Sequence, residues 1–138
     1  MGASLTLHVR SNSDAIAPAN EAAETWLATQ KISPEATYFA ALTIEELVTN
    51  CIKYGYDDSM EHTIDVELLV ADHTLTITVV DDGRAFDPLA VPRPDMAGAV
   101  EDRPIGGLGI HMLRELADKM SYERRGNTNR VTLTKRVA

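Results

Sequence analysis

The first half of the chain changes from a strand pattern to a helix pattern. Residues 4–10 are apolar at every second position, which predicts a β-strand with one buried face. Residues 15–31 carry an alanine-rich apolar stripe at helical spacing, behind polar residues that can cap a helix. A serine followed by proline then predicts a second helix over residues 34–54, which Gly55 ends.

The second half predicts two β-hairpins with a helix between them. Residues 63–70 and 74–80 alternate with period two around a short polar turn, as antiparallel strands do. A third helix is expected over residues 108–119. A final hairpin is expected from strands 120–124 and 130–137, joined by a Gly-Asn turn.

A proline-rich segment precedes the third helix. Residues 88–105 hold four of the six prolines of the chain, including two Arg-Pro pairs, so they form neither a long helix nor a central strand. Loops of this length inside a compact domain are uncommon unless they are functional or disordered. Because this segment separates two candidate motifs, we expect a lid over a ligand.

Composition limits the number of domains and the classes of partner. With 138 residues, 44% of them apolar, residues 1–138 are expected to form a single domain. A formal charge of −8 offers no basic stripe for a phosphate backbone, so direct nucleic-acid binding is not expected. A single cysteine, a start without a signal-peptide pattern and the lack of a long apolar run predict a cytoplasmic protein that does not enter a membrane.

Glu46 and Asn50 form the first candidate motif. They share one side of the second helix with Lys53, whereas Leu47 and Cys51 share its buried side, where the cysteine is expected to serve core packing. A carboxamide oxygen suits magnesium, and a nearby carboxylate can take a proton from a hydroxyl group or water. Taken alone, a solvated polar helix face is the simpler interpretation of this segment.

Asp81 is the second candidate. Leu75, Ile77 and Val79 occupy one face of their strand, and Asp81 continues that face by parity. A carboxylate on the core side needs a donor, which is either a structural group or a ligand group such as an adenine amine. An Asp-Gly turn is the alternative interpretation, although the segment that ends at Pro88 is longer than a tight turn requires.

The third candidate is the glycine cluster of residues 106–109, where the third helix opens. Backbone N–H groups at a helix N-terminus can face an anion such as phosphate. A flexible glycine segment before a helix explains the cluster equally well. The spacing of the glycines matches neither a Walker A loop nor a dinucleotide-binding fingerprint.

The three segments, in this order, resemble motifs of the GHKL ATPases, the superfamily of gyrase, heat-shock chaperone ATPases and histidine kinases. Residues 46–56 resemble the N box, residues 81–88 the first glycine box and residues 106–109 the second. The short chain, the Phe-Asp-Pro after the first box and the Gly-Leu-Gly-Ile-His-Met run are most similar to the anti-sigma-factor serine kinases. The resemblance covers residues 42–135.

The resemblance implies an α/β (α+β) two-layer sandwich, in which a mixed, mainly antiparallel sheet carries helices on one face and ATP lies between helices and lid. It implies that Glu46 is the base that activates the acceptor hydroxyl, that Asn50 ligates Mg²⁺ and that Asp81 binds the adenine amine. Gly83 leaves room for the adenine, and later glycines support the phosphates. The residues expected to contact the nucleotide are Asn50, Asp81, Gly83, Ala85, Gly106, Gly107, Leu108 and Gly109.

Function and partners follow from the same resemblance. Such proteins bind a sigma factor in one state, phosphorylate a serine of a STAS-domain anti-sigma antagonist in another, and commonly form homodimers. The chain departs from the family at Ala85, where a second glycine is usual, at Tyr54, where histidine is frequent, and in the late Gly-Thr pair, which is represented by Gly126 and Thr128. These departures leave the flexibility of the lid and the catalytic rate open.

Two other functions stay open at this point. One is an ATP-binding partner switch or anti-sigma module without kinase activity, which Glu46 disfavours because pure binding needs no base. The other is the catalytic domain of a two-component histidine kinase, which is disfavoured because no phosphoacceptor helix pair comes before the domain.

Overall fold

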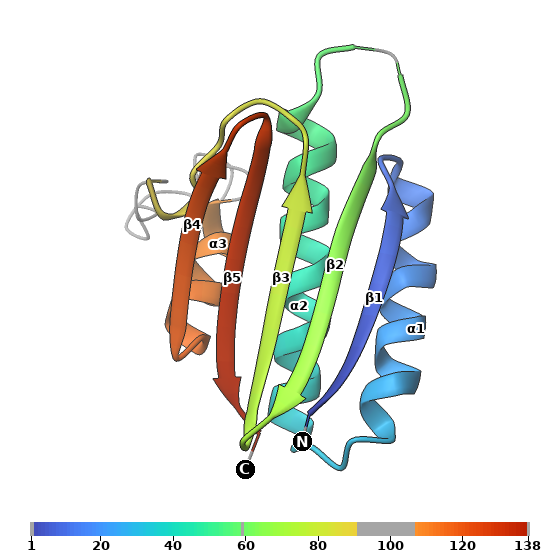
Figure 1. The fold of residues 1–138 in the computed structure, drawn as a ribbon, viewed down its shortest axis with the longest axis vertical. Coiled ribbons are helices and arrows are strands. Elements are labelled where there is room, and N and C mark those ends of the chain that lie inside the picture. The colour runs from blue at the N-terminus through green and yellow to red at the C-terminus, as the bar shows by residue number, and fades with distance from the viewer. Residues whose placement is uncertain (1, 59, 91–106, 138) are drawn as a thin grey trace, which may run out of the picture.

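The computed structural model describes residues 2–58, 60–90 and 107–137, and shows a five-stranded sheet with its helices on one face (Figure 1). Strand order is β1-β2-β3-β5-β4, and each of the four pairings is antiparallel. The predicted two-layer sandwich with a mainly antiparallel sheet is confirmed. The elements are β1 (Ala3–Arg10), η1 (Ser13–Ala15), α1 (Ile16–Ala28), α2 (Pro34–Asn50), η2 (Cys51–Gly55), β2 (Thr63–Ala71), β3 (Thr74–Asp81), η3 (Pro88–Ala90), α3 (Gly107–Leu116), β4 (Lys119–Arg125) and β5 (Thr128–Arg136).

Helix α2 runs behind the sheet, roughly along the direction of its strands (Figure 1), and carries the first motif. Its start is fixed by Ser33, whose side chain accepts a hydrogen bond from Ala36 N at 3.1 Å, and by proline at the first helical position. Phe39 and other apolar residues of α2 are fully buried against the strands. The helical path continues past Asn50 as the π-helical turn η2, which ends at Gly55. Such turns are frequent at functional sites.

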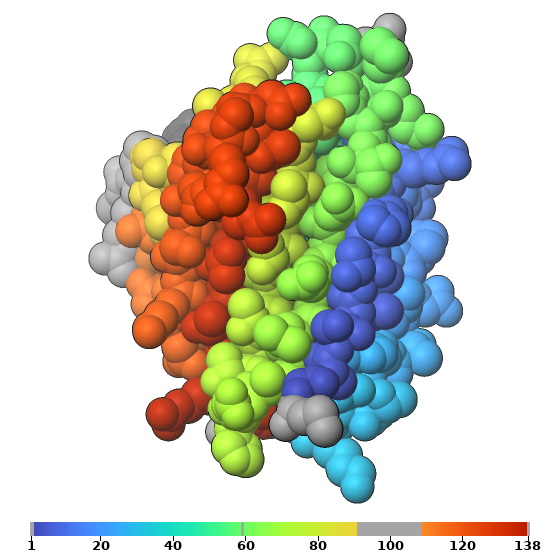
Figure 2. Space-filling model, viewed as in Figure 1, coloured from blue at the N-terminus to red at the C-terminus, as the bar shows by residue number. Residues whose placement is uncertain are grey.

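The sheet has one buried and one open face. Alternate residues of β2 and β3, such as Val66 and Ile77, point into the core below the helices and are fully buried. The residues between them, which include several threonines, face the other way. Figure 2 shows the strands side by side on this open face, with no helix over them. A buried row beside a polar row is the pattern expected of a half-covered antiparallel sheet.

Two predicted boundaries are wrong, and the second of them affects the site. The third helix ends at Leu116 rather than at residue 119, because the chain turns there and Asp118 N donates to Thr134 O at 2.8 Å. Strand β5 begins at Thr128, two residues earlier than predicted, because Gly126, with φ of +60°, closes a short turn. The earlier start places Asn129 inside the sheet.

The predicted lid over residues 88–105 is described only at its start, where residues 88–90 form the turn η3. The rest of the lid lies outside the described residues. Within the part of the chain that the structure describes, no helix is long and apolar enough to cross a membrane.

Candidate nucleotide-binding site

A pocket lies where η2, the end of β3 and the start of β5 meet. The space that the centre of a water molecule can reach in it is about 30 Å³, within about 400 Å³ of space between atoms that includes the open mouth. Its walls are mostly apolar, with a few buried polar side chains, which is typical of small-molecule sites. The lining residues are Leu47, Asn50, Cys51, Gly55, Val79, Asp81, Arg84, Phe86, Pro88, Asn129 and Val131.

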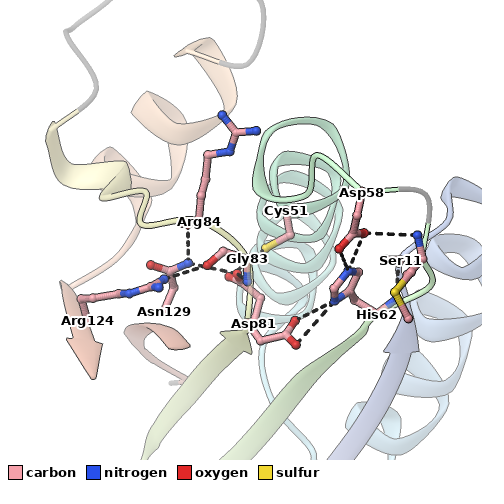
Figure 3. A network of polar contacts seen from close by, with 11 residues as sticks. Ser11, Cys51, Asp58, His62, Asp81, Gly83, Arg84, Arg124 and Asn129 are labelled. Carbon is pink, nitrogen blue, oxygen red and sulfur yellow. Dashed lines mark hydrogen bonds and ion pairs between the residues drawn. The ribbon is translucent and has the colours of Figure 1, made fainter. Parts of the chain in front are cut away.

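Asp81 lies at the base of this pocket, on the buried face of β3 that strand parity predicts. Only 7% of its surface is exposed. Its Oδ1 accepts hydrogen bonds from Gly83 N at 2.8 Å and from Asn129 Nδ2 at 3.0 Å, and its Oδ2 accepts one from Cys51 Sγ at 3.2 Å. Figure 3 shows these residues grouped around the carboxylate. The buried charge is therefore stabilised by protein donors, as burial of a carboxylate requires.

Asn129 is a residue of the site that the sequence prediction missed. It faces Asp81 directly across the β3–β5 pair and is only 2% exposed. Its amide nitrogen donates to Asp81 Oδ1 and, at 2.8 Å, to Arg84 O. Its oxygen accepts from Tyr122 OH at 2.6 Å and from Phe86 N at 3.3 Å. All four hydrogen bonds that an asparagine side chain can make are formed, so Asn129 fixes the orientation of Asp81.

Residue 83 is a glycine because the backbone of Gly55 lies too close for a side chain. A Cβ atom there would lie 2.9 Å from the carbonyl carbon of Gly55, which is closer than real side chains come. Arg84 N donates to Gly55 O at 2.8 Å, and Arg124 Nη1 donates to Gly83 O at 2.8 Å. These hydrogen bonds hold the first glycine box against the turn η2. Gly83 permits this close approach and does not itself line the pocket.

Asn50 is buried, not solvated. It is 6% exposed and lines the pocket, so the interpretation of a solvated polar face does not hold for it. Its Nδ2 is buried and has no hydrogen-bond partner among the described residues. A buried amide nitrogen without a hydrogen-bond partner lowers the stability of the fold, and a ligand that supplies an acceptor removes this cost. The group is therefore suited to an oxygen atom of a bound molecule.

Glu46 lies one helical turn before Asn50 and is half-buried. Burial, followed by the charge of Glu45, raises the pKa of the Glu46 carboxyl, and Lys53 opposes part of this rise. A Cβ atom on Gly109 would overlap the Glu46 carboxylate, so the first turn of α3 lies directly against this side chain. The N box and the second glycine box therefore touch, although neither Glu46 nor Gly109 lines the pocket.

None of the other residues expected to contact the nucleotide is among the described residues that line the pocket. Gly107 opens α3 and Leu108 follows it, while Gly106 lies outside the described residues. Ala85 is exposed and does not line the pocket, although its neighbours Arg84 and Phe86 do.

Beside the pocket, His62 joins the segment after η2 to the end of β3. Its ring stacks on Tyr56, with centroids 4.0 Å apart and planes 10° apart. Its Nε2 lies 2.8 Å from Asp58 Oδ1, and Figure 3 shows these two side chains facing each other. Its Nδ1 lies 3.2 Å from Asp82 Oδ1. The hydrogen bond with Asp58 is the main cause that raises the pKa of His62, and the same contact lowers the pKa of Asp58.

These contacts predict how folding stability depends on pH. The raised pKa of His62 gives stabilisation that is complete below the ordinary value of 6.5 and is lost as pH rises through the raised value. The urea concentration at the unfolding midpoint should therefore decrease as the pH is raised above 6.5. His62→Gln should remove this decrease. The control is His73→Asn, in the β2–β3 turn, where φ of 60° suits asparagine. An equal fall in wild type and His62→Gln would contradict the assignment.

Comparison with known proteins identifies the architecture. Residues 9–135 match the family described as histidine kinase-like ATPase domain. The chain belongs to this family. This match and the names of the relatives given below confirm the resemblance to the GHKL ATPases and their anti-sigma serine kinases.

Among relatives of this kinase-like ATPase domain, serine/threonine-protein kinase BtrW of Bordetella bronchiseptica is 26% identical over 106 residues, covering 77% of this chain and 75% of the relative. Serine-protein kinase RsbW of Listeria monocytogenes is 29% identical over 97 residues, covering 66% and 62%. Anti-sigma F factor of Bacillus subtilis is 25% identical over 92 residues, covering 64% and 63%. The matched region is thus less than two thirds of the length of the latter two relatives.

Solved structures show the same fold. The structure of the RsbU and RsbW domains of Rv1364c from Mycobacterium tuberculosis superposes with a TM-score of 0.68 at 17% identity, covering 98% of this chain and 32% of that one. Histidine kinase AdeS of Acinetobacter baumannii gives 0.53 at 15% identity, covering 95% and 68%. Membership of an ATPase family with relatives named kinases supports ATP use and, at a coarse level, phosphotransfer.

Proposed function

We propose that this domain is a cytoplasmic, ATP-dependent serine/threonine protein kinase of the anti-sigma type. In this proposal it binds a sigma factor, phosphorylates a serine of a STAS-domain anti-sigma antagonist and acts as a homodimer. The observation that carries the proposal is the buried Asp81 carboxylate, fixed by Asn129 at the base of a pocket that Asn50 also lines. The name anti-sigma F factor supports a sigma factor as partner, and the name serine-protein kinase supports a protein serine as acceptor. The STAS-domain antagonist is proposed from the family resemblance of the sequence motifs.

Asp81 and Asn50 are proposed to hold opposite ends of the nucleotide. The Asp81 carboxylate accepts a hydrogen bond from the adenine amine, while Gly83 lets the backbone approach closely enough to form the wall. Asn50 offers one oxygen ligand to Mg²⁺, and because such sites usually combine one or two protein ligands with substrate phosphates, a single side chain suffices. Bound Mg²⁺ would neutralise charge on the phosphates. Backbone N–H groups of Gly107 and Gly109 face the phosphates from α3.

Glu46 is proposed to be the general base. Its carboxylate takes the proton of the acceptor serine hydroxyl as the serine oxygen bonds to the γ-phosphorus and the bond to the β–γ bridging oxygen breaks. Phosphoserine and ADP are the products. Because its pKa is raised, the Glu46 carboxylate is a better proton acceptor than an exposed glutamate.

The test is phosphotransfer to a protein substrate. The domain, magnesium ATP and a STAS-domain protein encoded nearby are incubated, and the STAS protein is analysed by intact-mass spectrometry. We expect the mass of one phosphate on a serine and release of ADP. Tight ATP binding without phosphate transfer under any condition would support the second candidate, a nucleotide-dependent partner switch.

Gly109→Ala provides a further prediction about the base. The added methyl group would occupy the position of the Glu46 carboxylate, so that carboxylate must move away from α3. Misplacement of a catalytic group by about 1 Å can lower rates about 100-fold, and we expect phosphotransfer to fall at least about ten-fold. The measurement is the single-turnover rate, with the circular dichroism spectrum as the check on folding. A rate equal to wild type would show that the contact of Gly109 with Glu46 does not position the base.

A further inference from the structure

The open face of the sheet carries charges of opposite sign on two strands. There β2 presents the carboxylates of Asp65 and Glu67, and β5 presents Arg130 and Arg136. Asp65, Val80 and Arg130 form one row across the sheet, because each lies directly opposite the next. Strand β3 lies between the two charged strands and is uncharged on this face, where its residues are Thr74, Thr76, Thr78 and Val80. An acidic strand and a basic strand therefore flank a flat, uncharged centre.

These charges are not paired with each other within one chain. Arg130 and Glu67 make no hydrogen bond or ion pair among the described residues. Asp65 Oδ1 lies 2.7 Å from His8 Nδ1, while its Oδ2 has no partner in the same described ranges. Two strand spacings, about 10 Å in all, separate β2 from β5. Both charged strands are therefore available to a partner.

A hollow on the same face has the lining expected of an arginine site. The centre of a water molecule can reach about 230 Å³ of it. The hollow is lined by Thr6, Asp65, Glu67, Thr78, Val80 and Arg130. A guanidinium group that entered between the two carboxylates would meet both, and its planar fork matches carboxylate geometry.

We propose that the open face is the interface of a homodimer, in which Arg130 of each subunit enters the hollow of the other between Asp65 and Glu67. The inference rests on the homodimer of the proposed function and names the surface that forms it. Figure 2 shows this face, with no helix over it.

The strand order determines the symmetry of this dimer. Because β3 is the central strand, a two-fold axis parallel to β3 and between the two sheets places β2 of one subunit over β5 of the other. This rotation keeps each row at its height along the strands, so Asp65 meets Arg130 of the partner subunit, twice per dimer. Sheets stacked in this way keep their strands within about 30° of each other. A two-fold axis across the strands would instead place β2 over β2 and oppose like charges.

The face is large enough for a stable dimer. Five strands at a spacing of about 4.8 Å, with eight residues at a rise of about 3.3 Å, give a projected area of about 600 Å². Side chains corrugate the surface, so its accessible area exceeds the projected one and approaches the about 800 Å² per partner of a standard interface.

The test is a pair of charge reversals that rescue each other. Dissociation constants of the dimer are measured by sedimentation equilibrium for wild type, Asp65→Arg and Arg130→Asp. Each variant alone opposes like charges twice per dimer, so we expect its dissociation constant to rise at least about ten-fold. In an equimolar mixture every reversed charge meets an opposite charge on the other variant. Native mass spectrometry, which separates the species by mass, should therefore show mixed dimers in place of dimers of either variant.

The matched control is Glu21→Arg, the same change of charge at an exposed position of α1 in the helical layer. It should leave the dissociation constant within about two-fold of wild type. Rescue in the mixture also excludes a folding defect, because a variant that did not fold would not dimerise with the other.

Two results would overturn the inference. Dimers as tight as wild type in both single variants, or loss of dimers without rescue in the mixture, would remove this surface while leaving the proposed homodimer and ATP binding intact. A wild type that is monomeric at all concentrations would overturn the homodimer and this surface together. ATP binding, measured by calorimetry on the same preparation, tests the rest of the proposed function separately.

Discussion

Asp81→Asn is expected to weaken ATP binding about 100-fold, which corresponds to about 2.7 kcal/mol. The substitution keeps the shape of the side chain, and the remaining oxygen can still accept from Gly83 N and Asn129 Nδ2. The new NH₂ group replaces Oδ2, so a donor faces the adenine amine where an acceptor stood. Calorimetric titration with magnesium ATP measures the effect.

The control for this prediction is Asp82→Asn, the same chemical change one residue along, on an exposed carboxylate that contacts His62. It should alter ATP affinity less than about two-fold, because surface substitutions away from a site have small effects. An inosine nucleotide, which carries a carbonyl in place of the amine, should lose less affinity than ATP in Asp81→Asn. Equal ATP affinities in wild type and Asp81→Asn would remove Asp81 from the site.

Glu46→Gln is expected to lower the rate of phosphotransfer to a STAS-domain substrate by about 100- to 10,000-fold, which is the usual contribution of general acid–base catalysis. Glutamine keeps the length of the side chain beside Gly109 but cannot take the serine proton. ATP affinity should stay within about two-fold, because Glu46 does not line the pocket. Single-turnover transfer and ATP binding are measured on the same preparation.

Glu45→Gln is the matched control, since it neutralises the adjacent, exposed glutamate on the same helix. It should change the transfer rate only a few-fold, because Glu45 acts on Glu46 through its charge alone. If Glu45→Gln and Glu46→Gln were equally active, Glu46 would not be the base and the nucleotide-dependent switch would become the better account.

Local periodicity was sufficient to predict where Asp81 lies. A pleated strand alternates its side chains, so the row Leu75, Ile77 and Val79 brings Asp81 onto the buried face without any knowledge of the rest of the fold. The same argument applied to β5 would have found Asn129, which heads the inward row that continues with Val131 and Leu133. It was missed because the strand was predicted to start too late, after a turn whose length depends on backbone geometry at Gly126.

Contacts between distant segments could not be predicted in this way. Cys51 does pack against the core, as its place on the buried side of the predicted second helix indicates. Its hydrogen bond to Asp81, however, depends on how the turn η2, which begins at Cys51, meets β3. A π-helical turn has no signature in a pattern of period 3.6. The contact of Gly109 with Glu46 likewise depends on where α3 docks on α2, which the helix sequences alone do not specify.

Calorimetric titration of the unmodified protein with magnesium ATP and, separately, with magnesium GTP tests whether ATP binds in the pocket around Asp81. We expect one ATP per chain and a clear preference for ATP over GTP, because the Asp81 carboxylate would accept a hydrogen bond from the adenine amine and would meet an oxygen in guanine. Absence of ATP binding, or equal affinity for ATP and GTP, would contradict it.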